Sequence, residues 1–326
     1  MLEMKIHKIN TLKLARKIYS KVFHSDSDLD NSAGQKVYRG QQASDLIYDK
    51  LLEDNPAMIA RFGAVELSCM VNYLSVKHHK NDVAGYIKGT VSHFWWDKST
   101  IEQMADNAGF FPSNPDMLSR FSEMMIEDMQ LVDILGSWQE QESFFSDKLT
   151  NATRVGLFDL EPYNHDKPWS EALEGKKVLV IHPFEESIQS QFRKRELLFP
   201  NNKILPEFKL TTIKAIQTIA SNHAQYKNWF DALDYMKDKI SSTDFDIAII
   251  GCGAYGFPLA AHVKRIGKKA VHLGGATQTL FGIKGKRWEN QKEHQRVAAM
   301  MNEHWSRPLS TETPSGIQKV EGGCYW

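Results

Sequence analysis

The sequence has few cysteines, no long apolar run and no excess of charge of either sign. Its three cysteines, Cys69, Cys252 and Cys324, are widely spaced and form no CxxC pair. This usage argues against a disulfide framework or a zinc knuckle and favours a reducing compartment. No stretch reaches the roughly 20 apolar residues of a membrane-spanning helix, and no apolar N-terminal region precedes a cleavage site. We therefore expect a cytoplasmic protein that is neither integral to a membrane nor secreted through a signal peptide.

Positive and negative charges balance. Lys plus Arg and Asp plus Glu each number 40, and apolar residues make up 42% of the 326 residues. A neutral chain has no global field that would attract nucleic acid, so we expect no nucleic-acid partner. The composition is that of a folded soluble protein, and the length allows one large α/β domain or two closely packed lobes.

Residues 1–40 predict a helix followed by a linker. In Met1–Phe23, basic residues are interspersed with aliphatic ones as in a basic amphipathic helix, and residues 24–34 are rich in Asp and Ser. Two interpretations of the helix remain open. It packs on the body of the protein or on a partner chain, as in a homodimer, or it makes peripheral contact with anionic lipid at the inner face of a membrane.

Short Val- and Ile-rich runs alternate with helical patterns in the rest of the chain. This alternation predicts βα units and an α/β fold with a largely parallel, Rossmann-like sheet flanked by helices. The strongest run is Asp246–Gly251, because it is short, β-branched and uninterrupted, as in strands covered on both faces. The predicted strands are Met58–Phe62, Val155–Phe158, Lys177–His182, Ile247–Gly251 and Ala270–Leu273.

Two segments depart from this alternation. Apolar residues at helical spacing predict long helices between Asn107 and Leu149, and a helical segment runs from Trp288 to about Trp305. We therefore expect an N-terminal α/β part over residues 41–175 with a helical insertion. A second α/β part, over residues 176–326, ends in a helical C-terminal tail.

In open parallel sheets, ligands bind beyond the carboxyl ends of the strands, so the turns after the predicted strands are candidate sites. The turn Gly251–Gly256 matches GxGxxG, whose glycines let a helix N-terminus approach a phosphate. Three interpretations remain open: a phosphate or nucleotide site, a purely structural turn, and an NAD site that lacks the usual ribose-binding acid. The candidate residues are Gly251, Gly253, Ala254, Tyr255 and Gly256.

The next predicted strand ends in a second glycine turn, and basic residues follow further along the chain beside Trp288. Cationic side chains next to an aromatic ring suit pyrophosphate oxygens and a stacked base or sugar, although a solvated basic loop is the alternative. The candidates in this region are Gly274, Gly275, Thr277, Gln278, Lys286 and Arg287.

Two other turns carry ionisable side chains. His182 ends a strand and is a candidate to act on a diphosphate leaving group, unless hydrogen bonds merely hold it in place. In the turn Arg61–Glu66, Glu66 is a candidate general base or metal ligand, and Arg61 is a partner for Glu66 or for phosphate. Gly63 belongs to the same donor-binding turn. The alternative for Glu66 is a carboxylate that complements the helix dipole.

Three aromatic residues stand in a row at Phe94–Trp96. If exposed, Trp95 and Trp96 are candidates for stacking on the faces of an acceptor sugar. Burial in the core is the alternative for both.

The turns Arg61–Glu66, Gly251–Ala254 and His272–Gly275 together resemble those of the GT-D fold glycosyltransferases, over about Asn55–Trp288. That family uses nucleotide-sugar donors. The resemblance implies a GT-D-like fold in which the part over residues 176–326 binds the nucleotide.

The family's first motif reads Arg-Phe/Ile-Gly-Asp-Gly-Glu, and its Asp-x-Glu pair is linked to metal and donor binding. Here Ala64 takes the place of the aspartate and Val65 that of the second glycine, so only Glu66 of the acidic pair is present. The resemblance implies a divalent cation, Mn or Mg, and the exchange at Ala64 puts this dependence in doubt.

The implied function is transfer of a sugar from a nucleotide-sugar donor to a hydroxyl of a glycan or lipid-linked glycan, in capsule or O-antigen synthesis. Residues 175–210 and the C-terminal ending look like those of bacterial proteins encoded with surface-polysaccharide genes. We expect inversion at the anomeric carbon, because one base suffices for direct displacement. Two alternatives remain open: a Rossmann-like enzyme using NAD or S-adenosylmethionine, and a non-catalytic nucleotide-sugar-binding subunit.

Overall fold

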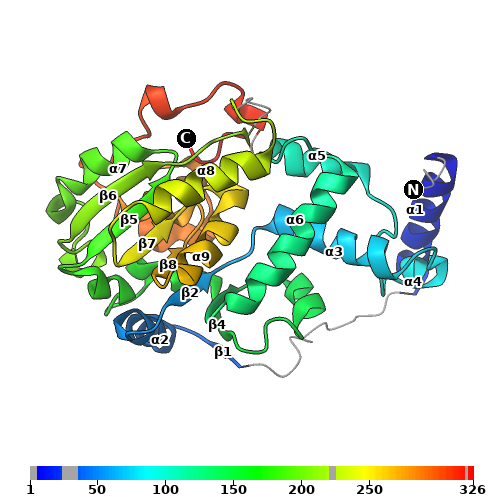
Figure 1. Cartoon of the computed structure of the whole chain (residues 1–326), viewed down its shortest axis with the longest axis horizontal. Coiled ribbons are helices and arrows are strands. Elements are labelled where there is room, and N and C mark those ends of the chain that lie inside the picture. Colours follow the sequence, from blue (N-terminus) through cyan, green and yellow to red (C-terminus); the bar gives the residue numbers. More distant parts are fainter. Residues whose placement is uncertain (1–5, 24–35, 220–224, 320–321) are drawn as a thin grey trace.

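The apolar runs of the sequence form one parallel sheet in the computed structural model of the chain (Figure 1). The structure describes residues 6–23, 36–219, 225–319 and 322–326. The strands within them are β1 (Val37–Tyr38), β2 (Ala57–Ala60), β3 (Ile134–Ser137), β4 (Thr153–Gly156), β5 (Lys177–His182), β6 (Lys209–Lys214), β7 (Ile247–Ile250) and β8 (Lys269–His272). They pair in the order β1-β4-β3-β2-β8-β7-β5-β6, and every pair is parallel. The predicted α/β class with a largely parallel sheet is confirmed.

The five predicted strands correspond to β2, β4, β5, β7 and β8, with some ends shifted. The sequence prediction missed the other three. The two residues of β1 are too few to give a pattern, and β6 lies at the sheet edge with half-buried side chains and no continuous apolar run. The strand β3 lies inside the segment for which long helices were predicted.

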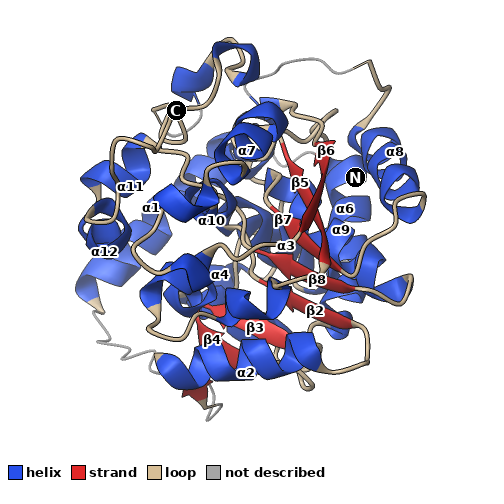
Figure 2. Ribbon diagram, turned by 90° about the vertical axis from the view of Figure 1, so that its left-hand side faces the viewer, coloured by secondary structure: helices blue, strands red, loops and turns tan. Residues whose placement is uncertain are grey.

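Helices cover both faces of the sheet (Figure 2). The helices are α1 (Ile6–Val22), α2 (Gln41–Leu52), α3 (Ala64–His78), α4 (Val83–Lys88), α5 (Lys98–Asp106), α6 (Pro115–Asp128), α7 (Glu185–Phe192), α8 (Trp229–Ser241), α9 (Gly256–Arg265), α10 (Ala276–Leu280), α11 (Lys286–Asn290) and α12 (Gln295–Ala298). Successive side chains of a strand point to opposite faces, so Met58 joins the core beneath α3, α6, α8 and α9, whereas Ile59 joins the core beneath α2, α7 and α10. Coverage of both faces explains why the central strands read as uninterrupted apolar runs.

The predicted helical insertion is only partly helical. Between Asn107 and Leu149 the chain forms α6 and then turns into β3, followed by a short 3-10 segment over Glu140–Phe145. Asn114 begins α6, because its side chain accepts a hydrogen bond from the N–H of Met117. The C-terminal tail consists of short helical turns, and its helix α12 ends at Ala298, before the predicted end.

The strand order brings the two predicted parts into one sheet, because β2 pairs directly with β8. The chain leaves β2 toward β3, and it reaches β8 from β7 on the other side. Helix α3, which follows β2, covers one face of the sheet, and α10, which follows β8, covers the other. Neighbouring strands whose turns lead to opposite faces form a topological switch point, and the carboxyl ends of parallel strands all meet at one edge. The division at residues 175 and 176 stays a prediction.

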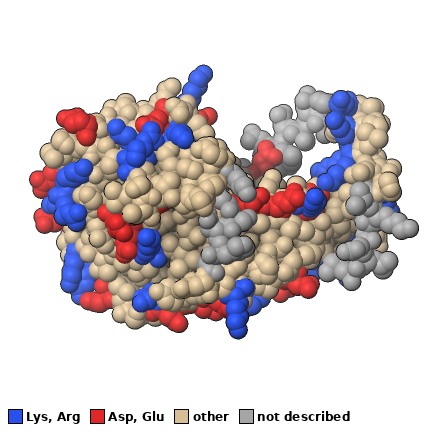
Figure 3. Space-filling view, turned by 90° about the horizontal axis from the view of Figure 1, so that it is seen from above, with Lys and Arg blue, Asp and Glu red and all other residues tan. Residues whose placement is uncertain are grey.

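The N-terminal helix α1 packs on α4 at the end of the molecule that projects from the sheet (Figure 1). Leu12 is buried there, Lys13 forms an ion pair with Asp97 at 2.6 Å, and the guanidinium of Arg16 lies 4.8 Å from the ring centre of Tyr86. The prediction of a helix packed on the body is thus confirmed for one face. Figure 3 shows Lys and Arg side chains on this projecting end. None of the described helices is long and apolar enough to cross a bilayer.

Candidate functional site

A cavity of about 430 Å³ opens at the carboxyl edge of the sheet. Its lining comes from the segments that follow β2 to β8, together with α11 and the C-terminal residues. Its size and its position at a switch point are those of a small-molecule site in an open α/β sheet. The turns that the sequence analysis proposed as candidate sites thus open onto one cavity.

Arg61 lies deep in this cavity, directly after β2. Its guanidinium stands 5.2 Å from the ring centre of Trp138, and its Nε is buried without a hydrogen-bond partner among the described residues. Gly274 makes room for it, because a Cβ there would lie 3.0 Å from Nη1 of Arg61. Burial lowers the pKa of Arg61, but a guanidinium stays charged in proteins. The cavity thus contains a fixed positive charge, and the Nε–H of Arg61 is available to donate a hydrogen bond to a ligand.

Glu66 occupies the first turn of α3, as predicted. Its carboxylate folds back over Gly63, so that any side chain at Gly63 would collide with it. Burial raises the pKa of Glu66, while its own backbone N–H and the charge of Arg61 oppose the rise. The carboxylate therefore complements the start of α3, which agrees with the structural alternative for this residue.

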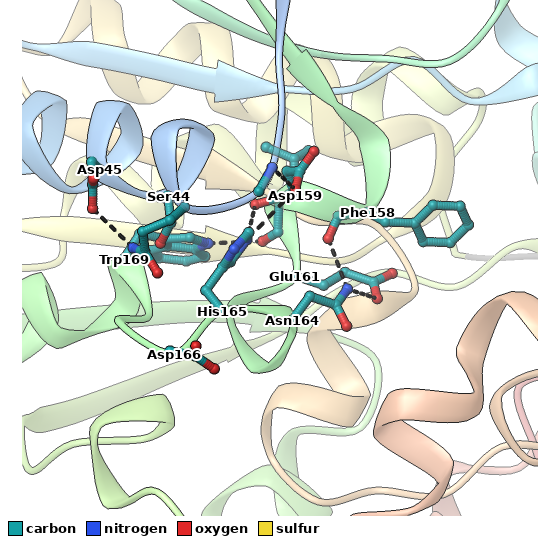
Figure 4. Close-up of polar contacts among 12 residues, drawn as sticks. Ser44, Asp45, Phe158, Asp159, Glu161, Asn164, His165, Asp166 and Trp169 are labelled. Carbon is teal, nitrogen blue, oxygen red and sulfur yellow. Dashed lines mark hydrogen bonds and ion pairs between the residues drawn. The ribbon is translucent and has the colours of Figure 1, made fainter.

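Glu161 is a cavity residue that the sequence analysis missed. Its side chain is only 7% exposed, and burial raises its pKa to about 7 against the opposing effects of Tyr163, Asn164 and Arg61. The amide of Asn164 donates to the Glu161 carboxylate at 3.3 Å and to the carbonyl of Phe158 at 2.8 Å (Figure 4). A carboxyl group with a pKa near neutrality is suited to take up a proton during a reaction. The strand-end rule, applied to the turn after Val155–Phe158, would have pointed to it.

Two buried histidines face the same cavity. Nδ1 of His182 accepts a hydrogen bond from the N–H of Phe184 at 3.0 Å, so its Nε2 carries the hydrogen. Burial lowers the pKa of His182 to about 3, and burial with the nearby charge of Arg61 does the same for His272. Both rings are therefore neutral near pH 7, and His182 can act there as a hydrogen-bond donor and not as a cation.

Each of the three glycines in Gly251–Gly256 occupies its position for a different structural reason. A side chain at Gly251 would collide with the turn after β8, and one at Gly256 would collide with the ring of His272. Gly253 has a φ of 57°, in the left-handed region, and no described atom lies within 4 Å of a Cβ built on it. Gly253 is thus the position where backbone faces open space at the start of α9.

The second glycine turn is joined to the C-terminus of the chain. The side-chain amide of Gln278 donates to the carbonyl of Tyr325 at 3.0 Å, and Nη1 of Arg287 donates to the Tyr325 hydroxyl at 3.2 Å. A side chain at Gly275 would collide with Tyr325 and crowd Trp288. The C-terminal segment therefore forms one wall of the cavity and holds Arg287 against it.

The structure brings most of the predicted site residues together and leaves five outside. Those that line the cavity are Arg61, Gly63, Glu66, His182, Gly251, Gly253, Ala254, Tyr255, Gly274, Gly275, Gln278 and Arg287. Gly256 and Thr277 pack behind the lining, and Lys286 is exposed to solvent. Trp95 packs on Tyr86 and Trp96 on the core beneath α3, so neither reaches the cavity.

The side chains around Glu66 do not fit a protein-bound metal. In the part of the chain that the structure describes, no group of three or more His, Cys, Asp or Glu residues is placed to hold an ion. Ala64 offers no ligand, and the positive charge beside Glu66 comes from Arg61. Hard divalent cations need several oxygen ligands, so the described residues do not form such a metal site by themselves.

Comparison with known proteins leaves the family open. No family model matches the chain, and no curated protein matches it. Two solved structures of the domain of unknown function 1792 are similar to it. One, a selenomethionine-substituted form, is 12% identical over 81% of this chain and 82% of its own, with a TM-score of 0.39. The other, described as having a distinct glycosyltransferase fold, is 13% identical over 92% of this chain and 96% of its own, with a TM-score of 0.42.

Proposed function

We propose that the chain is a glycosyltransferase that moves a sugar from a nucleoside diphosphate-sugar to a hydroxyl group of a glycan or lipid-linked glycan. The observation that carries this proposal is that Glu161, a buried carboxyl, and the guanidinium of Arg61 line one cavity at the carboxyl edge of the sheet. Burial raises the pKa of Glu161 to about 7, and Arg61 keeps its positive charge. The first group accepts a proton, and the second complements an anionic leaving group. Direct displacement of a diphosphate by a hydroxyl is accelerated by both kinds of group.

In the proposed reaction, Glu161 removes the proton of the acceptor hydroxyl while the oxygen of that hydroxyl attacks the anomeric carbon of the donor sugar. The bond between that carbon and the phosphate oxygen breaks, and its electron pair leaves with the nucleoside diphosphate. Arg61 and Arg287 stabilise the negative charge that develops there, and Nε2 of His182 adds a neutral hydrogen bond. One base and one displacement give inversion at the anomeric carbon.

Glu161 replaces Glu66 as the candidate base in this proposal. The Glu66 carboxylate already interacts with the backbone at the start of α3, whereas Glu161 retains a pKa suited to proton uptake near neutral pH. A metal ion is not assigned a step, because the described side chains do not form a metal site. The acceptor class of surface polysaccharide rests on the sequence resemblance alone.

The test is a thermal-shift screen of the purified protein against UDP-, GDP-, TDP- and CMP-sugars, NAD(H) and S-adenosylmethionine, each with and without manganese. A ligand that binds the native state raises the apparent melting temperature by mass action. We expect a shift with a nucleoside diphosphate-sugar, followed by transfer to a glycan acceptor. A shift with NAD(H) or S-adenosylmethionine alone would refute the proposal, and donor binding without turnover would favour a binding subunit.

We also propose that α1 makes peripheral contact with an anionic membrane. The helix contains no acidic residue, and Leu14, Ile18 and Val22 form an exposed apolar stripe next to Lys17 and Lys21. The wild-type protein should sediment with vesicles of anionic lipid, and less of it should sediment with neutral vesicles. The Lys17→Glu/Lys21→Glu variant should sediment less with anionic vesicles than the wild type does. Equal sedimentation with neutral and anionic vesicles would contradict this contact.

A further inference from the structure

Two aromatic side chains stay exposed at the cavity. Trp138 has 44% and Phe158 has 42% of its surface exposed, and both line the cavity. The other exposed large apolar side chains among the described residues, such as Phe144 at 50%, lie outside the lining. Apolar surface that stays exposed inside a binding cleft marks a place where a bound ligand packs against the protein.

The ring of Trp138 is held in a fixed orientation. Its Nε1 donates to the carbonyl of Phe62 at 3.2 Å, and its backbone N–H donates to Glu142 at 3.0 Å. Glu142 is itself buried and forms an ion pair with Arg154 at 2.7 Å. The guanidinium of Arg61 packs on the Trp138 ring, as noted above. A ring restrained in this way loses little freedom when it binds a ligand.

Phe158 shares an anchor with the candidate base. The amide of Asn164 that holds the Phe158 carbonyl also donates to the carboxylate of Glu161 (Figure 4). The Phe158 ring stands edge-on to His294, with ring centres 5.6 Å apart. The backbone of Phe158 is thus linked through Asn164 to the Glu161 carboxyl group, and its ring packs on His294.

The two rings also lie on the same side of the cavity. Ser137 of β3 pairs with Gly156 of β4, so Trp138 and Phe158 follow neighbouring strand ends. The glycine turns that can admit a diphosphate follow β7 and β8, beyond β2 in the strand order. An acceptor hydroxyl has to reach Glu161, which belongs to the β4 side. The acceptor is therefore expected beside the two rings, with the nucleotide on the opposite side.

We propose that Trp138 and Phe158 form a stacking subsite for a pyranose ring of the acceptor. This inference rests on the transferase function proposed above. A pyranose presents an apolar face of C–H groups while its hydroxyls project from the edge. An exposed aromatic ring covers such a face and leaves the hydroxyls free to react, so the subsite favours sugars over small polyols that have no apolar face.

The test is saturation-transfer NMR with the methyl β-glycosides of glucose, galactose and N-acetylglucosamine, each with and without UDP, GDP or TDP. We expect saturation of the ring C–H protons of at least one glycoside. It should fall about two- to tenfold in Trp138→Ala and in Phe158→Ala, the range for one aromatic contact. Phe144→Ala is the matched control, because it removes an equally exposed ring outside the cavity, and its signal should equal that of the wild type.

The outcomes separate this inference from the transferase proposal. Absence of a glycoside signal in the wild type, or equal signals in all variants, would overturn the subsite. Loss of nucleobase signals in Trp138→Ala would show that the rings stack on the donor base, which refutes the subsite and leaves the donor site intact. A glycoside signal that falls in Trp138→Ala and Phe158→Ala, with no signal from any of the three nucleotides, would support the subsite and refute the transferase. If Trp138→Ala fails to fold, Phe158→Ala decides the question alone.

Discussion

The two sides of the cavity are built from different kinds of groups. On the side of β2, β3 and β4, side chains dominate: Arg61, Trp138 and Glu161 bring charge, an aromatic surface and a titratable carboxyl. On the side of β7 and β8, backbone dominates, with the glycine turns at Gly253 and Gly274. The first side is equipped for reaction, and the second for close approach of a ligand.

This difference follows from the strand order. Because α3 after β2 and α10 after β8 lie on opposite faces of the sheet, the turns after these neighbouring strands diverge and leave the switch point open. Close packing behind the glycine turns excludes side chains there, as at Gly256 against His272. We therefore assign the chemistry to the side of β2, β3 and β4, here called the side-chain half. The binding of phosphates is assigned mainly to the side of β7 and β8, here called the backbone half.

The largest expected effect comes from the side-chain half. Glu161→Gln keeps the shape of the side chain and removes the proton acceptor, so the transfer rate should fall about 10²- to 10⁴-fold while donor binding persists. In the wild type the rate should rise with pH through about 7, as Glu161 loses its proton. Steady-state kinetics at several pH values measure both effects. Glu66→Gln is the comparison, and we expect it to lower stability more than the rate.

A rate in Glu161→Gln close to that of the wild type, with a larger loss in Glu66→Gln, would return the role of base to Glu66.

The next prediction tests whether Arg287 contributes to nucleotide-sugar binding in the backbone half. Arg287→Ala should weaken nucleotide-sugar binding by about 1.5–3 kcal/mol, the range for a hydrogen bond to a charged group. Lys286→Ala is the matched control, because Lys286 is the neighbouring cation but is exposed and outside the cavity lining. Isothermal titration with the donor measures both variants. Equal losses would indicate a general electrostatic effect in place of a contact.

A smaller effect is expected from the glycine that faces open space. Gly253→Ala and Gly267→Ala should each lower the free energy of unfolding by about 1–2 kcal/mol, because both positions have a left-handed φ, 57° and 80°. Only Gly253 lines the cavity, so only its substitution should also weaken donor binding. Chemical denaturation and donor titration distinguish the two effects. Unchanged donor affinity in Gly253→Ala would remove this turn from the binding site.

A final prediction concerns stability and pH. Burial raises the pKa of Glu161 from 4.5 to about 7, so the folded state holds this proton more tightly than the unfolded chain. The contribution of Glu161 to the free energy of unfolding should therefore fall as pH rises from about 4.5 to about 7. Glu161→Gln should remove that part of the pH dependence. Urea denaturation of both proteins across this range measures it, and parallel pH profiles would contradict the raised pKa.

The sequence predicted those parts of the fold whose signals are local. Runs such as Lys177–His182 and Ile247–Ile250 identify buried strands by themselves, and the turn that begins α3 places Glu66 correctly in a first helical turn. The strand β3 was missed, because four residues beside a helix carry too little pattern of their own. Its place is fixed by pairing with β2 and β4.

The site was predicted in outline and missed in its chemistry. Glycine turns and a strand-end histidine are visible in sequence, because they mark backbone that must bend at a strand end. Glu161 is not visible in this way, since its pKa depends on burial and on Tyr163, Asn164 and Arg61 around it. Tyr325 joins the site only because the C-terminus returns to Gln278 and Arg287.

The sequence by itself determined the α/β class, the order of most strands along the chain and the turns where a ligand could bind, because periodicity and glycine placement are local properties. Tertiary structure alone decided which of these turns meet and which carboxyl is buried. It also decided that Trp138 and Phe158, instead of Trp95 and Trp96, stay open at the cavity. The physical reason is that burial and electrostatic environment arise between segments distant in the chain, as when β2 pairs with β8.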